Sequence, residues 1–99
     1  MNRFRLSAEA AGVLKQIWEY IAEDSFDAAD RILDEIEEAF HRVSQMPRIG
    51  HRRQDLTKQD VLFWPVGSYL IVYEPDSDPL EVVAVLHGKR NISKILKKR

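Results

Sequence analysis

Few side chains in this sequence could carry out chemistry, and the three histidines are the first candidates. They are His41, His51 and His87, and their spacing matches no metal-binding motif. The chain contains no cysteine, so disulfides, cysteine-based metal sites and thiol nucleophiles are excluded. Its four glycines are scattered and form no phosphate-binding loop. We therefore expect no metal ion and no cofactor.

A nuclease that works without a metal is one chemistry that these residues could support. Such an enzyme needs a general base, a general acid and cations that stabilise the charge of the transition state. His87 would supply the acid or base, and Lys89, Arg90 and the arginines near residue 50 would supply the cations. The alternative interpretation is that His87 merely ends a strand and that the cations are ordinary surface residues.

Charge is unevenly distributed along the chain, although the formal net charge is only −1. Residues 19–38 contain nine acidic residues and one basic residue, which is typical of a solvated helix face. Residues 87–99 contain six basic residues and none that is acidic. This end is either a solubilising tail or a contact for nucleic acid or an acidic partner. A second basic group, Arg48, Arg52 and Arg53, surrounds His51.

The length of 99 residues, 44% of them hydrophobic, suits one domain with one packed core, which we expect to span residues 1–99. A secreted domain of this size usually needs disulfides, so the absence of cysteine favours the cytoplasm. No apolar signal region follows Met1, and no apolar run is long enough to cross a membrane. We therefore expect a soluble cytoplasmic protein.

The spacing of apolar residues predicts two helices and four strands that must position these side chains. The short link between the helices requires an antiparallel hairpin. The fold class is therefore α+β, with the order β-α-α-β-β-β and the helical hairpin packed on one face of a small, mostly antiparallel sheet. The expected elements are a strand over residues 3–6, a helix capped by Ser7 that runs to about residue 23, a helix over Phe26–Gln45, a polar loop over 48–60, strands over 61–66, 69–74 and 80–86, and a short helix over 91–96.

Three local predictions rest on glycine and proline residues. Gly12 lies inside the first helix, where glycine costs up to about 1 kcal/mol relative to alanine, so a close approach between the helices would explain it. Pro65 has no amide donor, so its strand lies at a sheet edge or ends there. The Gly67–Ser68 pair predicts a tight turn between two strands.

The predicted sheet has more apolar surface than two helices can cover, because two strands are apolar on both faces. In one strand the opposing sets are Tyr69, Ile71 and Tyr73, and Leu70 and Val72. In the last strand they are Val82, Ala84 and Leu86, and Val83 and Val85. The second face is either sealed by the long loop and the tail, or left as a groove for a helix or strand of a partner.

The order of elements and three sequence blocks resemble the RelE/ParE toxin superfamily. The blocks are MPRIG at residues 46–50, FWPVGSYLIVY at 63–73 and VLHGKRN at 85–91, and the resemblance covers nearly the whole chain. It implies the toxin of a type II toxin–antitoxin system, held inactive by a cognate antitoxin that wraps it with an extended segment and helices. Members of the RelE branch cut messenger RNA on the ribosome, and members of the ParE branch inhibit DNA gyrase.

The sequence is more similar to the ParE branch, because both predicted helices are long. Leu62 stands where the superfamily often has arginine, and residues 91–99 contain neither tyrosine nor histidine. We therefore expect a gyrase inhibitor that is not an enzyme, with gyrase and an antitoxin as its partners. The alternatives are a ribosome-dependent mRNA endoribonuclease, with His87 and Arg90 as catalytic residues, and a chain that keeps the antitoxin complex but has lost toxicity.

The resemblance and the charge pattern together assign candidate binding residues. Those expected to contact the target or its DNA are Arg48, Arg52, Arg53, Lys89, Arg90, Lys94, Lys97 and Lys98. Those expected to line an antitoxin groove on the sheet are Trp64, Tyr69, Ile71 and Tyr73.

Overall fold

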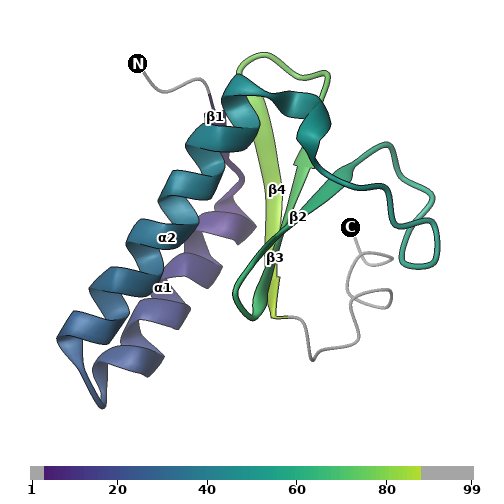
Figure 1. Cartoon of the computed structure of the whole chain (residues 1–99). Helices are drawn as coiled ribbons and strands as arrows, with labels where there is room; N and C mark the ends of the chain where they lie inside the picture. Colours follow the sequence, from purple (N-terminus) through teal and green to yellow (C-terminus); the bar gives the residue numbers. More distant parts are fainter. Residues whose placement is uncertain (1–3, 88–99) are drawn as a thin grey trace.

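A computed structural model describes residues 4–87 as two helices packed on a four-stranded mixed sheet (Figure 1). The predicted α+β class and the order β-α-α-β-β-β are confirmed. The short helix predicted over residues 91–96 lies outside the described residues. The elements are β1 (Phe4–Leu6), α1 (Ala8–Ala22), α2 (Phe26–Gln45), the 3-10 helix η1 (Pro47–Ile49), β2 (Leu62–Val66), β3 (Tyr69–Glu74) and β4 (Leu80–His87).

Both helices begin at a serine whose hydroxyl caps a main-chain amide. The Ser7 hydroxyl accepts a hydrogen bond from the Ala10 amide at 3.0 Å, and the Ser25 hydroxyl accepts one from the Ala28 amide at 3.1 Å. The two helices lie side by side, and the end of the hairpin projects beyond the sheet (Figure 1). Within residues 4–87, neither helix combines the length and the apolar character that a membrane span requires.

The strands lie in the order β1-β4-β3-β2. The β2–β3 and β3–β4 pairs are antiparallel, and β1 pairs with β4 in parallel. A parallel pair needs a long connection between its strands, and the helical hairpin with the following strands supplies it. The sheet is therefore mostly antiparallel, as predicted.

β2 forms one edge of this sheet, and His51 covers part of that edge. The amide and carbonyl of His51 bond to the carbonyl and amide of Phe63, both at 2.8 Å. Alternate residues of an antiparallel strand direct their main-chain groups to the same side, so Pro65 also faces outward. Its missing amide hydrogen therefore breaks no bond to β3, and the prediction that Pro65 lies on an edge strand is confirmed.

Apolar side chains are buried on both faces of the sheet. The helices cover one face, where Ile17, Ile36, Phe40 and Val43 belong to the same buried cluster as Ile71, Tyr73 and Val82. The opposite face carries Val61, Phe63, Val72, Val83, Ala84 and Leu86, none more than 8% exposed, and Leu56 of the loop packs against them. Of the two alternatives for the second face, the structure contradicts the open groove among the described residues, because that face is already buried and Leu56 of the loop packs on it.

A β-bulge in β4 changes which side chains face the helices. Val72 pairs with Ala84, whereas Tyr73 pairs with Val82, so Val83 is an extra residue opposite β3. Val82 and Val85 consequently lie in the helix-side cluster, while Val83, Ala84 and Leu86 lie in the opposite one. The strict alternation predicted for this strand is wrong, because the inserted residue shifts the pleat by one position.

Alanine substitutions at two glycines should change the free energy of unfolding in opposite directions. A Cβ atom at Gly12 would meet nothing within 4 Å, so the predicted close helix approach there is wrong. Gly12→Ala should therefore raise the free energy of unfolding by about 0.5–1 kcal/mol. Gly67 has a φ of 57°, which lies in the left-handed region that is unfavourable for alanine. Gly67→Ala should therefore lower the free energy of unfolding by about 1–2 kcal/mol. Urea denaturation measures both changes, and a less stable Gly12→Ala variant would contradict the explanation.

Candidate functional site

Tyr73 anchors the start of the loop that carries the predicted basic residues. Its hydroxyl donates a hydrogen bond to the Pro47 carbonyl at 2.7 Å and accepts one from the Gly50 amide at 2.9 Å. Burial of this residue raises the pKa of the hydroxyl above its ordinary value. A Cβ atom on Gly50 would collide with the hydroxyl, so glycine permits this close approach. The core thereby fixes where the loop begins.

Each of the three arginines around His51 that are expected to bind the target, Arg48 in η1 and Arg52 and Arg53 in the loop, is paired with an aspartate. The pairs are Arg48 with Asp76, Arg52 with Asp60 and Arg53 with Asp55. In the last pair, hydrogen bonds of 2.8 and 3.0 Å hold the pKa of the carboxyl below its usual range and raise that of the guanidinium. All six side chains are at least 44% exposed, so these pairs contribute little to stability and can exchange for another anion.

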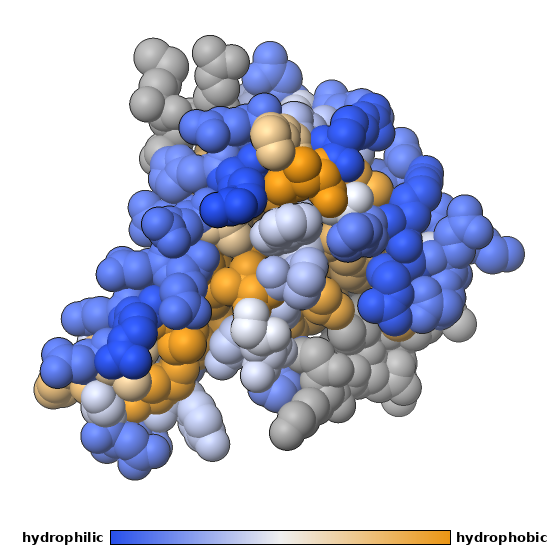
Figure 2. Space-filling view, in the orientation of Figure 1, coloured by the Kyte–Doolittle hydropathy of each residue, from blue (hydrophilic) through white to orange (hydrophobic). Residues whose placement is uncertain are grey.

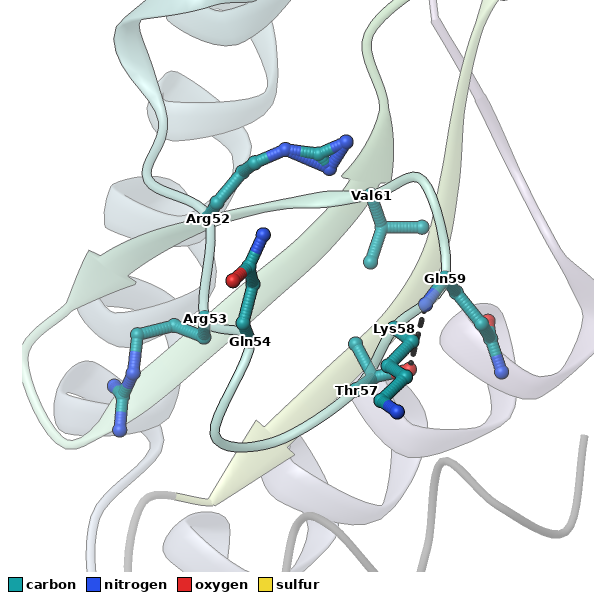
Figure 3. A pocket seen from close by; sticks show the side chains of 7 residues that line it. All are labelled: Arg52, Arg53, Gln54, Thr57, Lys58, Gln59 and Val61. Atoms are coloured by element: carbon teal, nitrogen blue, oxygen red, sulfur yellow. Dashed lines mark hydrogen bonds between the residues drawn. The ribbon is translucent and has the colours of Figure 1, made fainter.

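The loop between η1 and β2 encloses a polar pocket of about 430 Å³ (Figure 3). The main chain from Arg52 to Val61 runs around this pocket, and the side chain of Arg53 extends away from its centre. Arg52, Arg53 and Lys58 place three cations around the rim of this pocket, and Gln54 and Gln59 add two side-chain amides, so an oxyanion would be bound at the rim rather than at the centre. Its lining residues are Arg52, Arg53, Gln54, Thr57, Lys58, Gln59 and Val61.

An aromatic pair adjoins this basic loop. The His51 ring stacks on the Trp64 ring, with their centroids 6.2 Å apart and their planes 14° from parallel. His51 is exposed and Trp64 is half-buried. The main-chain amide and carbonyl of His51 both bond to Phe63, which holds the main chain of His51 beside β2, where its ring meets Trp64.

A second hollow, here called the helix–sheet cleft, lies between α2 and the β2–β3 turn and has a volume of about 260 Å³. Figure 2 shows apolar surface between the charged outer side of α2 and the strands. Within the cleft, Tyr69 packs edge-on against His87, with ring centroids 5.4 Å apart. The lining residues are Ile32, Glu35, Ile36, Val66, Gly67, Ser68, Tyr69 and His87.

His87 and the loop arginines lie at different places in the structure. His87 pairs with Tyr69 at one end of β3, whereas Tyr73, near the other end, holds the start of the loop. Among the described residues, the lining of the cleft contains no arginine or lysine. Residues 4–87 also contain no cluster of histidine and carboxylate side chains that could hold a metal ion. The other predicted cations, Lys89, Arg90, Lys94, Lys97 and Lys98, lie outside the described residues.

Two of the four predicted antitoxin-binding residues are buried. Ile71 and Tyr73 are both 0% exposed and lie under the helices. The expectation that they line an open groove is therefore corrected, because their face of the sheet is the one the helices cover. Trp64 and Tyr69 lie on the same face but remain half-buried, and Tyr69 lines the helix–sheet cleft.

Sequence reasoning missed several residues that line the two hollows. Ile32 and Ile36 belong to the apolar stripe of α2, where a cleft residue cannot be distinguished from a core residue. Gln54 and Lys58 lie in a polar loop without periodicity. The only available signal was that Lys58 is a fourth basic residue in the same loop. The role of the Tyr73 hydroxyl had no signal, because its partners are main-chain atoms.

Comparison with known protein families identifies the class of this protein. The family model described as "ParE toxin of type II toxin-antitoxin system, parDE" matches residues 4–92. The molecule is thus a toxin of a type II toxin–antitoxin system, which confirms that prediction. Within that class the chain belongs to the ParE toxin family. It is similar to Toxin ParE3 of Caulobacter vibrioides, with 26% identity over 100 residues that cover 100% of this chain and 99% of that protein.

The Tyr73 hydroxyl is open to a direct test of its anchoring role. Tyr73→Phe leaves the Pro47 carbonyl and the Gly50 amide without their partner, so the free energy of unfolding should fall by about 1–3 kcal/mol. Tyr20→Phe is the matched control, because Tyr20 is 77% exposed and its hydroxyl should matter by less than about 0.5 kcal/mol. Chemical denaturation of the two variants measures the difference.

The pH dependence provides a second readout of the same variant. The folded-state pKa of Tyr73 lies above its ordinary value of 10.0, so the unfolded chain loses this proton first as pH rises. The stability that the neutral hydroxyl provides is therefore complete below about pH 10 and is lost as pH rises through the folded-state pKa. Tyr73→Phe should lack this part of the alkaline decline. An identical alkaline decline in both proteins would show that the hydroxyl is not buried as described.

Proposed function

We propose that this toxin inhibits DNA gyrase in the cytoplasm and that a cognate antitoxin neutralises it. The observation that carries the proposal is membership of the ParE toxin family over residues 4–92. The relative from Caulobacter vibrioides is likewise named a toxin and matches along the full length of both chains. Neither name states a target, so gyrase enters here as our inference from the ParE branch.

The placement of His87 supports a toxin that binds its target rather than one that cuts RNA. A nuclease without a metal needs its acid, base and cations around one reacting phosphate. The described residues instead divide these groups between two places, with His87 in the helix–sheet cleft and Arg52 and Arg53 at the loop pocket. Arg90, the other residue of the nuclease hypothesis, lies outside the described residues.

The target contact in this proposal combines the loop with the basic end of the chain. Arg48, Arg52 and Arg53 are exposed and held by a loop whose start is fixed by Tyr73. Lys89, Arg90, Lys94, Lys97 and Lys98 would add positive charge on the basis of the sequence alone. Together they would attract an acidic surface of the target or the DNA that it holds.

The helix–sheet cleft is the proposed anchor site for the antitoxin. It combines the half-buried side chains of Ile32 in α2 and Val66 in β2 with the half-buried Tyr69 ring. Concave apolar sites of this kind accept the large side chains that contribute most to binding between proteins. Trp64 lies half-buried in the same strand as Val66 and extends this surface along β2.

The target proposal is tested with the purified chain in two parallel assays. Supercoiling of relaxed plasmid by gyrase should be inhibited, while mRNA on programmed ribosomes should stay intact. The His87→Ala variant should inhibit gyrase with a potency within about twofold of that of the parent chain, because inhibition by binding requires no proton transfer from His87. A ribonuclease would instead lose at least about a hundredfold in rate with this substitution. Transcript cleavage that depends on His87 would replace the gyrase proposal with the nuclease.

The antitoxin site is tested by removing the aromatic ring from the cleft. Tyr69→Ala should weaken antitoxin binding by about tenfold or more, because such a ring is a typical anchor of an interface. Tyr20→Ala serves as the control, since Tyr20 is exposed on α1 and does not line the cleft. Calorimetric titration gives both affinities, and thermal unfolding checks that each toxin is folded. Equal affinities for the two variants would move the antitoxin to another surface.

A further inference from the structure

We propose that the aromatic pair and the loop pocket together bind a single-stranded nucleic acid. The His51–Trp64 pair would stack one base, and Arg52, Arg53 and Lys58 would hold the adjoining phosphates. The inference deepens the proposed function. It rests on that proposal in one respect, namely that the loop contacts the target. It adds the chemical class of the ligand and can be tested without gyrase.

The aromatic pair has the properties of a platform for a base. Its rings lie 14° from parallel, and the outer member, His51, is exposed. The two 2.8 Å bonds to Phe63 fix the main chain of His51, and its ring already lies against Trp64 before any ligand arrives. Bases stack on such rings with little sequence preference, because every base presents a flat face.

The loop that follows His51 in the chain supplies the groups that contact a phosphate backbone. Arg52 follows His51 directly in the chain, and it lines the pocket with Arg53, Lys58 and the Gln54 amide. Within residues 4–87, Lys58 forms no ion pair. The two arginines are held by exposed carboxylates, which a phosphate can replace because an exposed pair is weak.

The combination favours a single strand over a duplex. A base can lie on the His51 ring only if its own face is free, and bases in a duplex are stacked on one another. A strand whose base lies on the ring places its neighbouring phosphates within reach of the residues that follow His51 in the chain. A surface that recognised charge alone would bind duplex at least as tightly as a single strand, because duplex has the higher charge density.

Fluorescence of Trp64 reports this binding directly. The chain has two tryptophans, and Trp18→Phe leaves Trp64 as the only one. In this background an oligothymidylate of about twelve nucleotides should quench the emission. The logarithm of the association constant should fall with the logarithm of the salt concentration by about 0.7 for each phosphate contact. Duplex DNA of equal length and inorganic pyrophosphate are the comparison ligands.

Side-chain variants then separate stacking from charge. His51→Ala should weaken oligothymidylate binding by about fivefold to a hundredfold, because a stacked base is lost while the main-chain bonds to Phe63 remain possible. Arg52→Ala should weaken binding and reduce the salt slope by about 0.7. Asp60→Asn should strengthen binding, because it removes the carboxylate that competes for Arg52. Lys15→Ala is the control for Arg52→Ala, because it removes one positive charge from α1, and it should have no effect beyond about twofold.

Three results would overturn the inference. They are equal affinity for duplex and single strand, quenching by pyrophosphate alone, and unchanged oligothymidylate binding in the His51→Ala variant. A chain that inhibits gyrase without binding the oligothymidylate would refute this inference and leave the proposed function standing. A chain that binds the oligothymidylate without inhibiting gyrase would refute the proposed function and leave this inference standing.

Discussion

The two central strands, β3 and β4, are apolar on both faces, and burying these faces determines much of the rest of the structure. The helical hairpin can lie on only one of them, so the other must be covered by other parts of the chain. Leu56, from the loop between η1 and β2, packs on that second face. The loop is therefore part of the core at one point and carries basic side chains elsewhere. Tyr73 links the two roles, because its ring lies under the helices while its hydroxyl holds the start of the loop.

Local signals in the sequence were sufficient for the elements and their order. Tertiary packing does not override the local conformational preferences of these segments. The signals are the apolar stripes of the helices, the capping serines, Pro65 and the Gly67–Ser68 turn. The bulge at Val83 could not be predicted, because an extra valine in a strand of valines changes the pleat without changing composition. The sequence also could not decide between a sealed second face and an open groove, since burial of that face depends on contacts between residues distant in the sequence.

For the candidate site, the sequence indicated which residue types matter but not which ones meet. The loop arginines were recognisable as a basic group, yet their aspartate partners only become evident once the loop is folded. His87 and these arginines looked like one catalytic set, whereas the sheet separates them by most of the length of β3. Ile32 and Ile36 were identified only as part of a helix stripe, because the cleft exists only where α2 meets the β2–β3 turn.

The outer edge of β2 has a consequence for the toxin before its antitoxin is present. An open strand edge can recruit the edge of another molecule and so start self-association and aggregation. Here the bridge from His51 occupies the main-chain groups of Phe63, and Pro65 has no amide hydrogen to offer to an incoming strand. This side of the newly made protein therefore resists edge-to-edge polymerisation. An antitoxin that engages this side must do so through side chains rather than by extending the sheet across Phe63–Pro65.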